Sequence, residues 1–110
     1  MTNQINQYYN QKYFDLKNQL IIRYKCCVIT GAPPNVCDIV YIQPLFRLTK
    51  SKYDIDNCLL LRYDLINLYN YNQIKICPNT LKIKIDEPYY ASFNNRRIYI
   101  HKDSVIYLIT

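Results

Sequence analysis

Few side chains in this sequence could act as catalysts or metal ligands, and their spacing limits what they could do. The chain has 110 residues and a single histidine, His101, near its end. Its five cysteines, at positions 26, 27, 37, 58 and 77, include no C-x-x-C pair. Structural zinc sites normally take paired ligands, so this pattern argues against one. No secretory leader pattern precedes the cysteines, so we expect reduced thiols in an intracellular protein that is not secreted.

The other candidates for chemistry are two carboxylates and a phenol. Asp38 and Tyr41 lie in one predicted strand, and Asp64 lies in a predicted helix. Because Asp38 and Tyr41 are an odd number of positions apart, a regular strand would turn them to opposite faces. A tyrosine phenol has an unperturbed pKa of about 10. Tyr41 would therefore be a poor general base near neutral pH without strong activation.

The charge of the chain points to an anionic partner. Lysine and arginine outnumber aspartate and glutamate by 14 to 8, a formal charge of +6. Such an excess favours nucleic acid first and an acidic membrane surface second. No apolar run reaches the ~18 residues that a spanning helix needs, so we expect no membrane segment. Eight cations are candidate phosphate contacts, with tyrosines available to stack on bases: Lys50, Lys52, Arg62, Lys75, Lys82, Lys84, Arg96 and Arg97.

The elements that must position these side chains form one domain over residues 1–110. Apolar residues at helical spacing predict a helix from about Gln11 to Tyr24, with residues 1–10 either frayed and flexible or beginning that helix. A short strand over 25–29 and a strand over 36–42 follow, separated by a turn at Gly31, the only glycine. A basic loop over 45–56 leads to a second helix over 59–69.

The last third of the chain predicts short strands. Segments 73–77 and 81–85 flank a turn at 78–80. In the second segment Lys82 and Lys84 alternate with apolar residues, which predicts a half-exposed strand with a basic outer face. A third strand is expected over 97–100, and Asp103 or Ser104 could cap a short final helix. The fold class is therefore α+β.

Several spaced motifs resemble the HNH, or ββα-metal, family of endonucleases. Residues 20–31 resemble the family's entry Y…C-x-[IV]-T-G, and 40–44 stand where the family has A-H-I-x-P. The run N-C-L-L-L-R-Y-D-L-I-N-L-Y-N over 57–70 follows N-[GA]-L-L-L-R-x-D-L-H-x-L-[FY]-D. Residues 74–83 follow I-x-I-x-P-x-T-L-x-I. The resemblance covers about residues 14–85, and the compact form is also similar to HNH proteins of large DNA viruses.

The resemblance implies a ββα-metal unit with an N-terminal helix and an extra C-terminal hairpin and strands. In the family a His at the end of the second strand activates water, and a His on the helix helps to hold one divalent metal. Here Tyr41 and Ile66 stand at these positions, and Asn70 stands where the family often has Asp. Asn57 is retained, and in the family that Asn shapes the loop that orients the base. The resemblance thus implies degenerate catalytic positions at Tyr41 and Asn57 and a vestigial metal position at Ile66.

Three functions are open from the sequence. The first is an HNH-fold protein that binds nucleic acid, DNA before RNA, needs no cofactor and has lost nuclease activity. The second is a divergent endonuclease that uses Mg²⁺ or Mn²⁺ to cleave DNA. The residues that could supply the missing groups are Tyr41, Asp38, Asn57, Asp64 and His101. The third is a structural subunit of a viral or ribonucleoprotein assembly, whose 13 tyrosines would suit a protein partner or self-association.

Overall fold

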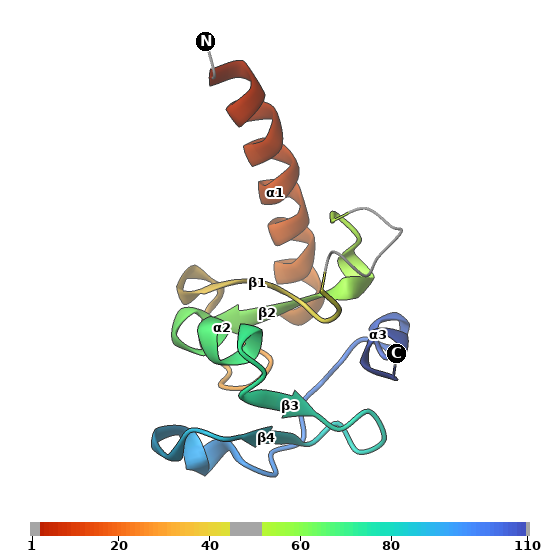
Figure 1. The fold of residues 1–110 in the computed structure, drawn as a ribbon. Helices are drawn as coiled ribbons and strands as arrows, with labels where there is room; N and C mark the ends of the chain where they lie inside the picture. Colours follow the sequence, from red (N-terminus) through yellow and green to blue (C-terminus); the bar gives the residue numbers. More distant parts are fainter. Residues whose placement is uncertain (1–2, 45–51, 110) are drawn as a thin grey trace.

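The computed structural model describes the backbone of residues 3–44 and 52–109, and the side chains of 11–44 and 52–109. This part of the chain is a small α+β domain with two two-stranded antiparallel sheets (Figure 1). The first sheet pairs β1 with β2, and the second pairs β3 with β4. The helices and strands are α1 (Asn3–Tyr24), β1 (Cys37–Tyr41), β2 (Cys58–Arg62), α2 (Tyr63–Asn70), β3 (Ile74–Ile76), β4 (Ile83–Ile85) and α3 (Ile106–Ile109).

The long helix α1 packs on the hairpin through its C-terminal half. Leu16, Leu20 and Tyr24, at helical spacing, are buried there, as expected of an amphipathic helix. The helix begins at Asn3, which agrees with the alternative that residues before Gln11 already belong to it. Its N-terminal end stands away from the rest of the molecule (Figure 1). No helix in the described residues is long and apolar enough to cross a membrane.

Strand β2 occupies a segment that the sequence assigns to a helix. The predicted helix over 59–69 is wrong in its first turn, because α2 begins only at Tyr63. The four residues from Cys58 to Leu61 are each no more than 1% exposed, and both α1 and α2 pack against the strand. A strand covered on both faces has a continuous apolar run rather than an alternating one, so periodicity cannot separate it from a buried helix.

The partner of β1 is also different from the predicted one. Segment 25–29 is not a strand: Lys25, with a φ of +67°, follows the end of α1. A turn then closes where the Gly31 amide donates to the Cys27 carbonyl at 2.9 Å. Gly31 has a φ of +77°, which confirms the turn conformation expected of it. The hairpin instead pairs β1 with β2 across residues 42–57, with Tyr41 opposite Cys58.

The second sheet lies at the end of the molecule opposite to the α1 N-terminus (Figure 1). Strands β3 and β4 confirm the predicted pair, shortened to three residues each. The expected third strand over 97–100 is reduced to an isolated bridge between Lys82 and Arg97. It is reinforced by backbone hydrogen bonds from Ile83 to Arg96 (3.0 Å) and from Ile98 to Leu81 (2.8 Å). Ile98 is buried, so this segment closes the core beside β4.

The C-terminal helix is present but starts differently from the prediction. A 3-10 turn over Lys102–Ser104 precedes α3. His101 caps that turn, because its Nδ1 accepts the Asp103 amide at 3.2 Å. Ser104, one of the two expected caps, is fully buried.

Candidate functional site

Asn57 holds the chain where it leaves β1. Its side chain is 1% exposed. Its Oδ1 accepts the Gln43 amide at 2.8 Å, and its Nδ2 donates to the Gln43 carbonyl at 3.2 Å. The Ile42 amide also donates to the Asn57 carbonyl at 2.9 Å. These bonds give Asn57 the loop-fixing role expected of it, whereas its part in any catalysis stays a prediction.

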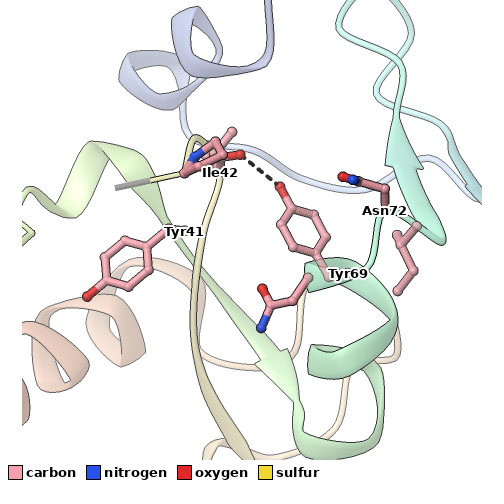
Figure 2. A pocket seen from close by; sticks show the side chains of 7 residues that line it. Tyr41, Ile42, Tyr69 and Asn72 are labelled. Atoms are coloured by element: carbon pink, nitrogen blue, oxygen red, sulfur yellow. Dashed lines mark hydrogen bonds between the residues drawn. The ribbon is translucent and has the colours of Figure 1, made fainter. Parts of the chain in front are cut away.

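A hollow of about 580 Å³ opens where β1 and α2 end. In Figure 2, Tyr69 points toward Ile42, and its hydroxyl donates to the Ile42 carbonyl at 3.4 Å. Burial raises the pKa of Tyr69 to about 12. No carboxylate is among the described residues that line this hollow, so it offers no anionic ligand to a metal ion. They are Tyr41, Ile42, Pro44, Tyr69, Asn70, Asn72 and Ile74.

Tyr41, at the position of the family's base, is turned away from α2. Its ring lies on the other side of β1 from Tyr69 (Figure 2). Burial raises the pKa of the Tyr41 phenol, and the nearby Cys58 and Tyr53 raise it further. A raised pKa makes the phenolate still scarcer at neutral pH, which weakens Tyr41 as a base.

Ile66, at the vestigial metal position, packs partly buried against the core and does not line the hollow. Its hydrocarbon side chain offers no atom to a metal. Strand β1 and helix α2 do pack on each other. The two family positions therefore lie on neighbouring elements, but the structure does not bring them together as a site.

Both candidate carboxylates already have partners. Asp38 accepts a hydrogen bond from the Tyr13 hydroxyl and lies 4.0 Å from Lys17 Nζ, both on α1. Asp64 accepts two bonds from Arg62, at 2.6 and 2.8 Å, and one from the Tyr90 hydroxyl at 3.0 Å. The Arg62 guanidinium lowers the pKa of Asp64. Neither carboxylate belongs to a residue that lines the hollow. Arg62, a predicted phosphate contact, already pairs with Asp64.

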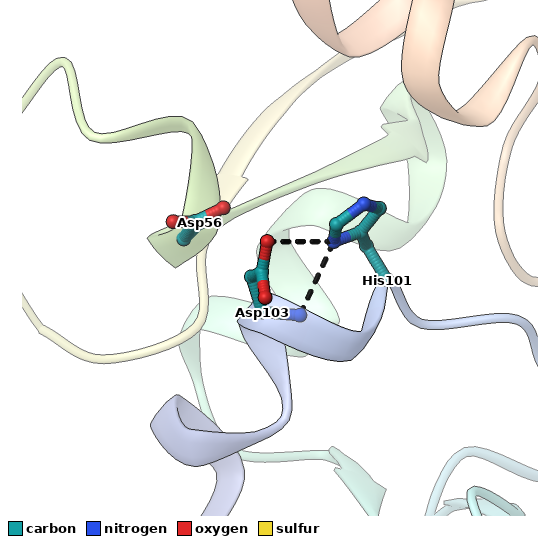
Figure 3. Close-up of side chains that lie close together, drawn as sticks. All are labelled: Asp56, His101 and Asp103. Atoms are coloured by element: carbon teal, nitrogen blue, oxygen red, sulfur yellow. Dashed lines mark hydrogen bonds and ion pairs between the residues drawn. The ribbon is translucent and has the colours of Figure 1, made fainter.

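A second group of polar side chains gathers where the C-terminal segment meets residues 55–57. Asp56, His101 and Asp103 have ligand atoms that all lie within 4.8 Å of one another (Figure 3). The Arg23 guanidinium already pairs with Asp56 at 2.9 Å. His101 Nδ1 accepts a backbone hydrogen bond and lies 3.8 Å from an Asp103 oxygen. This group lies where the C-terminal segment packs on residues 55–57, and sequence reasoning missed it because Asp56 and His101 are far apart in the chain.

The clearest unbalanced charge lies on the exposed side of the second sheet. Lys75 is directly opposite Lys84, and Lys82 is directly opposite Arg97. All four side chains are exposed, whereas Ile74, their neighbour in β3, is buried. Among the described residues none of the four pairs with a carboxylate. We call Lys75, Lys82, Lys84 and Arg97 the basic face.

The other predicted phosphate contacts do not join the basic face. Arg96 donates to the Ile29 carbonyl at 2.7 Å and lies over the Phe93 ring at 4.8 Å. Lys52 lies over the Tyr53 ring at 5.3 Å. Lys50 falls outside the described residues. The structure therefore brings together four of the eight predicted cations.

One cysteine belongs to the same surface. All five cysteines are free, and Cys77 alone among them is exposed. It follows Lys75 by two residues, and its amide bonds the Lys82 carbonyl at 2.9 Å. Hydrogen bonds from Thr80 lower the pKa of Cys77, whereas burial raises the pKa of Cys58 to about 12. Cys77 is therefore the thiol best placed to report on the basic face.

No protein-family model matches the chain, and none of the curated proteins matches it.

Proposed function

We propose that this protein binds nucleic acid through the basic face. The observation that carries the proposal is the pairing of like charges, Lys75 with Lys84 and Lys82 with Arg97, in register on one exposed surface. Like charges directly opposite each other destabilise a sheet, by up to about 1 kcal/mol for each pair. Binding of a row of phosphates would offset this repulsion with attraction between opposite charges. It would also release the counterions bound to the nucleic acid.

The proposal also concerns the scaffold formed by β1, β2 and α2. β1, β2 and α2 follow one another as a hairpin and a helix, the element order of a ββα unit. The strands are not the expected pair 25–29 and 36–42, and Tyr41 ends the first strand of the hairpin and not the second. Asn57 bonds the loop after β1 as the resemblance implies. We take these features as support for an HNH-like frame that has kept its loop and changed its catalytic positions, Tyr41 and Ile66.

On this proposal the protein binds DNA without a cofactor and does not cleave it. Cleavage needs a base near neutral pKa and a metal ligand beside it. The Tyr41 phenol has a raised pKa, and Asp38 and Asp64 are held by α1 and by Arg62. A supercoiled plasmid incubated with excess protein and Mg²⁺ or Mn²⁺ should stay intact. Nicking that disappears with Asp64→Asn would contradict this part of the proposal.

Salt dependence tests the binding itself. If each cation of the basic face neutralises one phosphate, log K should fall against log salt with a slope of about −3.6 for duplex DNA. The double variant Lys75→Gln/Lys84→Gln should lower that slope to about −1.8 and weaken binding roughly 30-fold at 0.15 M salt. Fluorescence anisotropy of a labelled duplex measures both quantities.

The matched control is Lys25→Gln/Lys102→Gln, which removes the same charge from two exposed lysines elsewhere in the chain. It should change affinity less than threefold. Equal losses in the two double variants would mean that only net charge matters, and no salt slope would mean that no phosphates are contacted. Either result removes the basic face as the binding surface.

The alkylation rate of Cys77 provides a second, independent test of binding at the basic face. In a Cys26→Ser background, saturating DNA should slow alkylation of Cys77 at least severalfold, because the bound backbone would cover the thiol. An unchanged rate at saturation would place the DNA on another face.

A further inference from the structure

Tyr99 lies next to the basic face and exposes an aromatic ring. Its side chain is 61% exposed, although the neighbouring Ile98 and Ile100 are each 4% exposed. Exposure therefore alternates along this segment, with Arg97 and Tyr99 both on its outward side. Two extended residues span about 7 Å, so the backbone of Tyr99 is within about that distance of the backbone of Arg97.

The ring is held in place. Tyr99 packs edge-on against Tyr24, with ring centroids 5.8 Å apart and planes at 64°. Tyr24 is itself 7% exposed, and its hydroxyl accepts the His101 amide at 3.2 Å. A ring that packs against the core through Tyr24 and is still 61% exposed loses little side-chain freedom when a ligand stacks on it.

A fixed ring beside cations has the composition of a base-stacking platform. Proteins that bind single strands combine a basic track for phosphates with aromatic rings on which bases stack. In a duplex the base faces are already covered by neighbouring bases, so an exposed ring can stack only on an unpaired base. Tyr99 therefore distinguishes between two forms of nucleic acid that the lysines alone would bind similarly.

We propose that the basic face and Tyr99 together bind single-stranded nucleic acid, with phosphates on Lys82 and Arg97 and one base stacked on the Tyr99 ring. This inference rests on the proposed function and narrows its substrate class. On this proposal Tyr99 determines the preference for single strands over duplexes. The lysines and Arg97 supply the affinity that depends on charge.

The first test compares Tyr99→Leu with wild type on three probes: a 20-nucleotide single strand, a 20-base-pair duplex and inorganic polyphosphate. Loss of one stacked base should weaken single-strand binding about tenfold. Duplex and polyphosphate affinity should change less than twofold. Tyr99→Phe, which keeps the ring, should restore wild-type affinity. The matched control is Tyr63→Leu, an exposed tyrosine at the start of α2, which should leave all three affinities unchanged.

A spectroscopic readout accompanies the affinities. The chain has no tryptophan, so Tyr99→Trp introduces a single tryptophan at the platform, which can be excited at wavelengths where the tyrosines do not absorb. Its fluorescence should be quenched by the single strand and not by polyphosphate, because only a base can stack on the indole.

The outcomes separate the two proposals. If single-strand binding is unchanged in Tyr99→Leu, or if it falls in step with polyphosphate binding, the stacking role of Tyr99 is refuted while the basic face stands. If wild type binds none of the probes at low salt, the proposed function itself is refuted. Thermal unfolding of Tyr99→Leu excludes a general loss of fold as the cause.

Discussion

Charged side chains around the β1–α2 junction lie beside groups that pair with them, whereas those of the basic face lie opposite like charges. Around the junction each carboxylate has a partner: Asp38 with Tyr13 and Lys17, and Asp64 with Arg62. On the basic face, cations stand opposite cations without any described carboxylate nearby to pair with them. Compensated charges hold a structure together, whereas aligned uncompensated ones raise its energy until an anion binds. We infer from this contrast that the β1–α2 region acts as scaffold and that the proposed binding surface lies on the second sheet.

The largest expected effect belongs to the scaffold. Asn57→Ala removes both hydrogen bonds that the buried Asn57 side chain makes with the backbone of Gln43. The free energy of unfolding should fall by about 2–3 kcal/mol in urea titrations. Nucleic-acid affinity, measured well below the unfolding midpoint, should change little.

Asn67→Ala is the matched control for that variant. Asn67 is an exposed asparagine in the middle of α2, and its replacement should change stability by no more than about 0.5 kcal/mol. Equal destabilisation by the two variants would contradict the special role of Asn57.

The second prediction is that one substitution in the basic face raises stability and lowers nucleic-acid affinity. Lys84→Glu places a carboxylate directly opposite Lys75. The unfolding free energy should rise by about 0.5–1 kcal/mol because an attractive pair replaces a repulsive one. Nucleic-acid affinity should fall by about tenfold or more at low salt. If stability and affinity fall together, the variant has damaged the sheet and the contrast between the two regions is lost.

The third prediction separates paired from unpaired arginine. Arg62 is bound in a fork to Asp64, whereas Arg97 stands opposite Lys82. Arg62→Gln should therefore weaken nucleic-acid binding less than twofold, and Arg97→Gln about fivefold at 0.15 M salt. Comparable losses of affinity in the two variants would mean that nucleic acid also contacts Arg62. The scaffold and the binding surface would then not be separate regions.

The smallest effect is a pH dependence of stability at the same pair. Arg62 lowers the pKa of Asp64 in the folded protein. The stabilisation is therefore fully present above the unfolded pKa of about 3.9 and is lost as pH falls through the lower folded value. Because the pair is partly exposed, its size should be under about 1 kcal/mol. Asp64→Asn should flatten the unfolding free energy between about pH 5 and pH 2, and an unchanged profile would contradict the pairing.

The local features of the fold were predictable because they depend on neighbours in sequence. The C-terminal half of α1, the β3–β4 pair and the turn at Gly31 follow from periodicity and from single residues with special backbone freedom. Asn57 was also predictable as a loop-fixing residue, because an amide can satisfy an amide and a carbonyl at once. The alternation of Lys82 and Lys84 with apolar residues also indicates a basic outer face.

By itself the sequence determined which residues are apolar, which are charged and where α1 and the second hairpin form. Only the tertiary structure decided that 58–62 is a strand, because burial on both faces, not periodicity, selects between strand and helix there. Tertiary structure also decided the pairing of Lys75 with Lys84 and of Lys82 with Arg97, and the approach of His101 to Asp56. These contacts depend on register and packing between distant segments, which no local pattern encodes.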